Sequence, residues 1–242
     1  MIGGLVAAKI DPQIMGRLAA GKRTAIVTGA SGTPDRPWLT VVMDDYSRAV
    51  CGYMVFTGAP SAMNTALVLR QAIWRKTEPA WAMCGLPDVL YIDHGSDFTS
   101  RHLEYTAVAL KIRLIYSTVG RPQGRGKIER FFGTVNTELL TTLPGHLTPR
   151  ARAPKPQLSL ADLDQTIGRF VTEYNERPHS EIGASPKEAW IGDGWLPRMP
   201  DSLDQLDELI TAGRRIRLCK GSYTGPPSVT LIRPHDIDLR MA

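Results

Sequence analysis

The spacing of apolar positions divides the chain into short strands followed by helices. Apolar and β-branched runs predict strands at 23–29, 38–44 and 49–57, and the short connections between them predict an antiparallel meander. From 61 to 76 the apolar residues recur at helical spacing instead. Downstream we expect a strand at 88–92, a helix at 99–110, a strand at 112–116, and helices at 126–143 and 159–175. We expect Ser159 to cap the last of these helices, and the helix at 126–143 to be amphipathic with one apolar face: Ile128, Phe131, Phe132, Val135 and Leu139.

This order of elements predicts an α/β fold: a mixed sheet with helices on its faces. The chain of 242 residues is long enough for one large domain and an appendage. We expect an N-terminal extension at 1–22, a core at 23–192, and a linker with a truncated C-terminal segment at 193–242. The last segment is rich in Gly and Pro and weakly periodic, so we expect it to be the least ordered part of the chain.

The formal net charge of +5 and the pI near 9.2 weakly favour an anionic partner such as nucleic acid. The basic residues are grouped rather than spread evenly, and one group lies within ten residues: Arg121, Arg125, Lys127 and Arg130. A solvated surface is the alternative interpretation of any one group.

Several classes of protein are disfavoured. The three cysteines have no zinc-ligand spacing, and this indicates a reduced, cytoplasmic protein. No apolar run approaches the roughly 20 residues of a membrane span. The stretch KRTAIVTGASGTP resembles the start of a short-chain dehydrogenase but lacks the final glycine of a dinucleotide site. We interpret it as a glycine-bearing hairpin turn.

Two carboxylates lie where a metal site could form. Asp93 ends the predicted strand 88–92, and Glu129 lies in the first turn of the predicted helix 126–143. Carboxylates at a strand end and on an adjacent helix could converge on Mg²⁺ or Mn²⁺, which prefer oxygen ligands. Alternatively, Asp93 caps a turn and Glu129 pairs with Arg125 or Arg130.

Four segments together resemble the DDE-type integrase/transposase superfamily, and most closely its Mu-like transposases. They are RPWLTVVMDDYSRAVCGY (36–53), GLPDVLYIDHGSDF (85–98), GRPQGRGKIERFFGTVNTELLTTLPG (120–145) and YNERPHSEIGASPKEAW (174–190). The resemblance implies a ribonuclease-H-like fold that cleaves DNA strands and transfers them with Mg²⁺ or Mn²⁺, a DNA transposase or integrase core.

The resemblance also implies roles for individual residues and partners. Asp93 and Glu129 would be the second and third catalytic, metal-binding acids. The DNA contacts would come from the glycine-rich loop and the helix that follows it, through Arg121, Gln123, Arg125, Lys127 and Arg130. The expected partners are the transposon ends, the target DNA, further copies of the chain and accessory transposition proteins.

The chain departs from the family pattern at the first acid. The family places an aspartate upstream of RPWLT, but the window IMGRLAAGKRTAIVTGASG contains neither Asp nor Glu. Asp11, Asp44 and Asp45 remain candidates, although Asp44 and Asp45 match residues that brace a turn. We also expect a small, incomplete C-terminal β segment. The alternative function is therefore an impaired or shortened relative that binds DNA or full-length transposase as a regulator or relic.

Overall fold

The computed structural model describes most of the chain between residues 37 and 220, together with three short strands before it. The described ranges are 4–9, 27–28, 34–35, 37–58, 61–92, 101–116, 126–144, 157–192, 194 and 196–220, with side chains left out of the description for 4–9, 27–28, 34–35 and 212–220.

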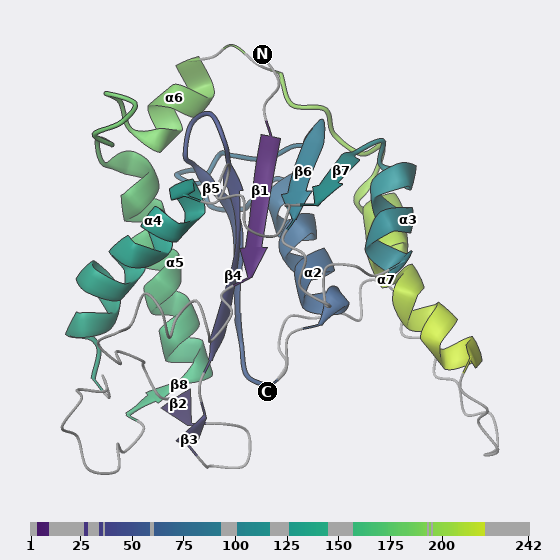
Figure 1. Cartoon of the computed structure of the whole chain (residues 1–242), viewed down its shortest axis with the longest axis horizontal. Coiled ribbons are helices and arrows are strands. Elements are labelled where there is room, and N and C mark those ends of the chain that lie inside the picture. The colour runs from purple at the N-terminus through teal and green to yellow at the C-terminus, as the bar shows by residue number, and fades with distance from the viewer. Residues whose placement is uncertain are drawn as a thin grey trace.

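A five-stranded mixed sheet forms the centre of the molecule, in the order β5-β4-β1-β6-β7 (Figure 1). The strands are β1 (Gly4–Lys9), β4 (Trp38–Asp44), β5 (Val50–Phe56), β6 (Val89–Ile92) and β7 (Arg113–Tyr116). β1, β4 and β5 pair antiparallel, whereas β1, β6 and β7 pair parallel. This is the ribonuclease-H-like arrangement implied by the sequence, and four of its strands were predicted within one or two residues.

The first strand of the sheet is not the predicted one. Gly4–Lys9, assigned above to an N-terminal extension, forms the central strand, while 23–29 contributes only β2 (Val27–Thr28) to a second, small sheet. A central strand is a short apolar run without alternation, because both faces of the sheet are covered. Pairing with β4 and β6 therefore overrides the higher β-propensity of 23–29.

The small sheet confirms the hairpin interpretation of the glycine-bearing stretch. β2 pairs antiparallel with β3 (Pro34–Asp35) and parallel with β8 (Leu158–Ser159). The chain therefore reverses direction between 28 and 34, as a hairpin requires and as a strand feeding a nucleotide-binding helix does not.

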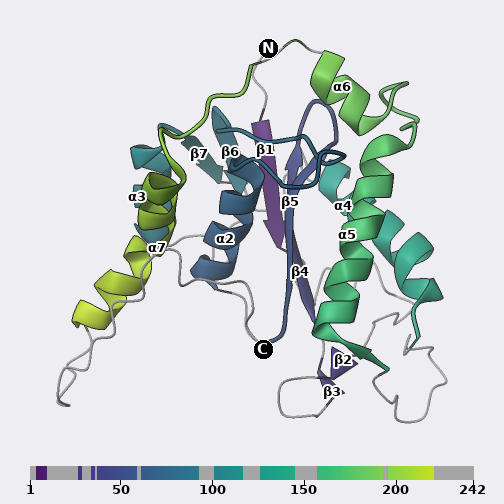
Figure 2. The ribbon, with the colours of Figure 1, turned by 180° about the vertical axis from the view of Figure 1, so that it is seen from behind.

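Helices cover both faces of the sheet (Figures 1 and 2). On one side lie α2 (Ala62–Ile73), α3 (Arg101–Ala109) and α7 (Leu203–Lys220), and on the other α4 (Gly126–Thr134) and α5 (Leu160–Glu176). α4 continues through a wider turn at Val135–Leu139 and a tighter one at Leu140–Thr142, which completes the predicted helix. A short helix, α6 (Pro186–Gly192), follows α5. No helix in the described part of the chain is both long and apolar enough to span a membrane.

Local sequence signals explain where the helices begin and which faces they bury. Ser159 caps α5 in a reciprocal capping box with Asp162, as predicted. On α4, the predicted apolar face is buried, with Ile128 and Phe131 each 1% exposed. Phe131 packs edge-on against Tyr174 of α5, with ring centroids 4.9 Å apart. The two helices are thereby fixed to each other.

Asn175 attaches α5 to the outer strand β5 of the sheet. Its side-chain oxygen accepts from the N–H of Val50 at 2.9 Å, and its amide donates to the Val50 carbonyl at 3.1 Å. An outer strand presents unpaired backbone groups, and here one buried side-chain amide satisfies both groups of a residue.

α7 was not predicted, because 193–242 shows only weak periodicity. Its Leu206 and Ile210 are completely buried, and Asp207 forms a two-pronged ion pair with Arg70 of α2. Two apolar residues four apart and one ion pair therefore dock the helix, and such a short pattern is hard to separate from chance in sequence. The predicted C-terminal β segment was assigned to 193–242, of which Leu203–Lys220 forms α7 instead and 221–242 lies outside the described residues.

Candidate metal and nucleic-acid site

The end of β6 brings the chain to the first candidate acid. Ile92, the last residue of β6, is buried and pairs with Ala7 of the central strand. Asp93 follows immediately and lies outside the described residues. β1 itself reads Gly-Leu-Val-Ala-Ala-Lys and contains no carboxylate. The strand that borders the end of β6 therefore offers no acidic side chain within its own span.

Glu129 is positioned by the buried face of α4. Its neighbour Ile128 is anchored in the core, whereas Glu129 is half-buried and Arg130 is exposed. Among the described residues, no hydrogen bond or ion pair engages the Glu129 carboxylate, and Arg130 pairs with Glu181 instead. Of the two partners proposed as alternatives for Glu129, Arg130 is thus used elsewhere, and Arg125 lies outside the described residues.

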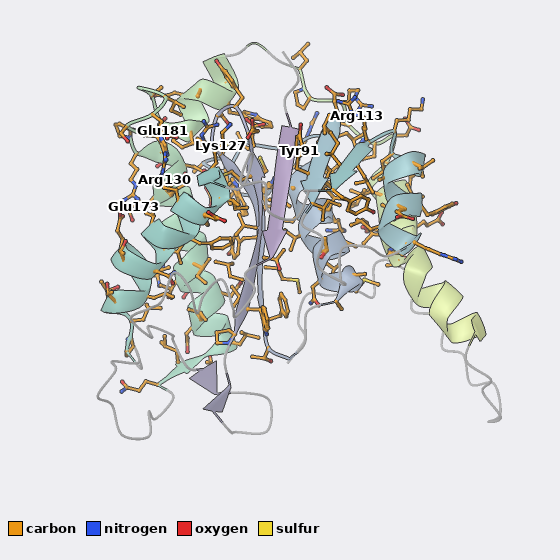
Figure 3. The ribbon with its side chains drawn as sticks, viewed as in Figure 1. Tyr91, Arg113, Lys127, Arg130, Glu173 and Glu181 are labelled. Atoms are coloured by element: carbon orange, nitrogen blue, oxygen red, sulfur yellow. The ribbon has the colours of Figure 1, made fainter. Side chains whose placement is uncertain are left out.

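The two described cations of the expected DNA-contacting set are both held by carboxylates. Lys127 Nζ lies 2.8 Å from Asp45 Oδ1 and 3.1 Å from the Asp45 carbonyl oxygen. Arg130 forms an ion pair with Glu181. Figure 3 shows Lys127, Arg130 and Glu181 on the same side of the molecule, around the start of α4. Arg121, Gln123 and Arg125 lie outside the described residues.

Asp44 has a structural role in the turn between β4 and β5. Its carboxylate accepts from both the N–H and the hydroxyl of Ser47, each at 2.7 Å, and is buried. Burial raises the pKa of the Asp44 carboxyl, while the bonds from Ser47 act in the opposite direction. Asp44 pairs with Leu5 near the beginning of β1, whereas Asp93 follows the far end of β6. It therefore braces the turn, as the sequence interpretation held.

A divalent metal would find one suitable oxygen ligand in the described part of the site. The Glu129 carboxylate is partly accessible and, within that part, unpaired, which suits a hard cation. No group of three His, Cys, Asp or Glu side chains arranged for a metal ion occurs among the described residues, a set that includes neither Asp93 nor Asp11.

Two residues near α4 escaped the sequence interpretation, although both lie in segments quoted for the resemblance. Arg48, in DYSR, adopts a left-handed backbone with φ of 65° and lies 3.7 Å from Glu181 through its Nε. Glu181 is in RPHSE and contacts Arg130. The quoted segments therefore meet in space although more than 130 positions separate 48 from 181.

Three features together define the class of protein. They are the order of the strands in the sheet, the helices on both of its faces, and a carboxylate on α4 that follows a basic stretch of sequence. The chain belongs to the DDE integrase/transposase superfamily. The family model described as TnsB C-terminal domain matches residues 26–145, and that described as Integrase core domain matches 110–186.

The chain is similar to two characterised transposition proteins. It is 48% identical over 180 residues to the transposase for transposon Tn552 of Staphylococcus aureus, covering 74% of this chain and 37% of that protein. It is 27% identical over 121 residues to the Tn7 transposition protein TnsB of Escherichia coli, covering 46% and 17%. The chain thus spans well under half the length of these relatives.

A solved structure supports the fold independently. A chain of the simian T-cell lymphotropic virus intasome, determined in complex with PP2A regulatory subunit B56 gamma, superposes with a TM-score of 0.51 at 15% identity. The match covers 81% of this chain and 57% of that one. At this level of identity the likeness concerns the fold.

Proposed function

We propose that the chain is the catalytic core of a DNA transposase, built to cleave DNA strands and transfer them in a metal-dependent reaction. The observation that carries the proposal is the Glu129 carboxylate on α4, unpaired among the described residues while the flanking cations Lys127 and Arg130 are paired. Similarity to the Tn552 transposase, which extends over three quarters of this chain, supports the same assignment.

In this proposal Asp93 and Glu129 hold Mg²⁺ or Mn²⁺. When bound, the metal supplies the activation of a water or 3′-hydroxyl and neutralises the leaving oxygen. Glu129 is presented from a helix anchored by Ile128 and Phe132, so its position is fixed before a cation arrives. Asp93 directly follows β6, a four-residue strand that is paired on both sides.

The DNA backbone would lie along the start of α4 and the segment before it. Arg121, Gln123, Arg125, Lys127 and Arg130 would contact phosphates, giving affinity with little choice of sequence. Replacing Arg121, Arg125 and Lys127 by Ala should flatten the slope of log affinity against log salt by roughly 0.9 for each phosphate that is no longer neutralised. A triple variant that binds duplex DNA like the parent would exclude this segment as the contact surface.

The decisive experiment is nicking of a supercoiled plasmid with Mg²⁺ or Mn²⁺. We expect little Mg²⁺ activity from the chain as it stands, because β1 carries no acid to complete the three-carboxylate set. Mn²⁺ should support a trace of nicking that Asp93→Asn and Glu129→Gln both remove. Strong Mg²⁺ activity that neither substitution reduces would overturn the assignment of both acids.

A gain-of-function pair tests the missing acid directly. Ala7 pairs with Ile92, the residue before Asp93, and successive strand positions project to opposite faces. We therefore expect one of Ala7→Asp and Ala8→Asp to raise Mg²⁺-dependent nicking, and Asp93→Asn to abolish the gain. Thermal unfolding of each variant checks that the sheet survives. Failure of both folded variants would direct the search to Asp11 and then Asp45.

The absence of an acid from β1 also favours a second function. A core that binds DNA, or a full-length transposase, without cleaving would act as a regulator or persist as a relic. Self-association and binding to accessory transposition proteins are compatible with either function. A strand-transfer assay with and without an active Tn552-type transposase separates the two functions. A regulator would reduce strand transfer by the added transposase, whereas a catalytic core would transfer strands without it.

A further inference from the structure

Two arginine side chains lie beside one carboxylate near the start of α4, and a third arginine lies close to the adjacent Tyr174. Arg130 contacts Glu181 directly, and Arg48 Nε lies 3.7 Å from Glu181 Oε2. Arg177 stacks on Tyr174 with 5.8 Å between guanidinium and ring centre, and its charge acts on the same carboxylate's neighbour His179. Two guanidinium groups thus lie beside the single carboxylate of Glu181, whereas Arg177 has its own partner in Glu138.

Arg48 supplies an unsatisfied donor at this place. Its terminal NH1 donates to the carbonyls of Asp45 and Tyr46, and this ties the guanidinium to its own turn. Its Nε is buried and, among the described residues, has no hydrogen-bond partner. A buried donor without an acceptor is unfavourable. Glu181 approaches this N–H without reaching hydrogen-bond distance, so the N–H could donate to an oxygen of a bound anion.

The backbone of Arg48 supports a role for its side chain. The residue adopts a positive φ of 65°, which glycine or asparagine adopts at lower cost than arginine. At this turn a long cationic side chain is present although a residue without one would suit the backbone better. Such local strain is common where a side chain serves a binding site.

Glu181 is held weakly enough to be replaced. Its side chain is 38% exposed and that of Arg130 is 56% exposed, and ion pairs between exposed groups contribute little to stability. The hydrogen bond from Arg130 keeps the pKa of the Glu181 carboxyl below its ordinary value, so the group is anionic at neutral pH. A phosphate can receive charge-assisted bonds from two guanidinium groups at once.

We propose that Arg48 and Arg130 form a phosphate-binding site that Glu181 occupies in the DNA-free protein, and that a phosphate of the DNA backbone displaces Glu181 when DNA binds. The inference rests on the proposed function for the identity of the ligand. It adds Arg48 to the DNA-contacting residues and makes Glu181 an internal competitor of DNA. Glu181 would thereby weaken unproductive binding until enough other contacts are made.

Glu181→Gln is the direct test, with Asp88→Asn as its matched control. Asp88 forms a comparable exposed ion pair with Arg198, with 3.0 Å between Oδ1 and NH2, at the start of β6. Both substitutions raise the net charge by one and remove the carboxylate of an exposed ion pair with arginine. We expect Glu181→Gln to tighten duplex binding about three- to tenfold in EDTA and to steepen its salt dependence by roughly one phosphate contact. Asp88→Asn should change affinity less than twofold.

Arg48→Gly provides the converse. The positive φ suits glycine, which offsets part of the loss of the bonds from NH1 to the Asp45 and Tyr46 carbonyls. We expect this substitution to reverse the gain of Glu181→Gln in the double variant, with thermal unfolding checking that the double variant is folded. Equal DNA affinity of Glu181→Gln and Asp88→Asn, with a lower melting temperature for Glu181→Gln alone, would show a purely structural ion pair and refute the inference.

Pyrophosphate separates this inference from the proposed function. If the site accepts phosphate, pyrophosphate should raise the melting temperature of Glu181→Gln more than that of Asp88→Asn. A rise without any DNA binding at low salt would overturn DNA as the ligand and the proposed function with it. DNA binding that strengthens in Glu181→Gln, without metal-dependent nicking, would uphold the site while refuting the catalytic assignment.

Discussion

Replacing Gly52 by alanine should separate the outer strand β5 from helix α2. A Cβ at this position would lie 2.7 Å from the Val68 carbonyl oxygen and 3.0 Å from the Ala72 amide nitrogen. Both atoms belong to the backbone of α2, so no rotamer change can relieve the contact. The strand and the helix would have to move apart, and the adjacent bond from Tyr53 N–H to Gln71, at 2.7 Å, would lengthen with them.

The expected cost follows from overpacking of a tightly packed interior. Adding a methyl group to such an interior destabilises proteins by about 1–3 kcal/mol. We expect the cost of Gly52→Ala to lie in the upper half of that range, because the added methyl group would clash with backbone atoms. In a protein of about this size each kcal/mol lowers the melting temperature by about 2–4 °C. We therefore expect Gly52→Ala to melt roughly 4–12 °C below the parent.

Gly133→Ala is the matched control, because it adds the same methyl group on α4 with nothing within 4 Å. Alanine is the better helix former by up to about 1 kcal/mol, so this variant should melt slightly above the parent. Calorimetry or far-UV circular dichroism of both variants provides the comparison. Equal melting temperatures for Gly52→Ala and the parent would refute the close approach of β5 to α2.

Three further predictions concern single contacts. Asn175→Ala should lower the free energy of unfolding by about 1–3 kcal/mol in denaturant titrations, because the Val50 N–H loses its buried acceptor; an unchanged midpoint would contradict this. Burial lowers the pKa of Lys76 to about 8, so the unfolded state binds more protons between pH 8 and 10 and stability should rise with pH there; Lys76→Met should lack that rise. Asp207→Asn should accelerate hydrogen exchange in α7 by leaving the Arg70 guanidinium unpaired, whereas its exposed neighbour Glu208→Gln should not.

The fold was predictable where the elements have a local signal. The amphipathic face of α4 and the Ser159 cap of α5 are properties of neighbouring residues, and both were predicted correctly. The central strand was not, because Gly4–Lys9 has no alternation or turn signal that marks it out from other apolar runs. Only its pairing with β4 and β6, more than 25 and 75 residues away, selects it.

The residues of the candidate site also differ in whether the sequence carries a signal for them. Asp93 and Glu129 were proposed because their spacing and surroundings match a family pattern, and Glu129 does lie in the first turn of α4 with its carboxylate unpaired among the described residues. Arg48 and Glu181 carried no such signal, because an ion pair between distant residues leaves no pattern in one sequence. Their contact is apparent only in the structure, where the turn after β4 and the segment after α5 meet at α4.

The central strand shows how fold and chemistry can separate in this superfamily. β1 completes the sheet through backbone hydrogen bonds to β4 and β6, and any short apolar run of suitable length can make them. In the proposed function metal binding would instead need a carboxylate at one position of that strand, and the sheet does not depend on that carboxylate. A chain can therefore keep the core, the α4 carboxylate and the basic surface while its first strand lacks the acid. If Arg48 and Arg130 bind phosphate as we propose, the surface that they form with Glu181 would bind and release DNA whether or not strands are cut.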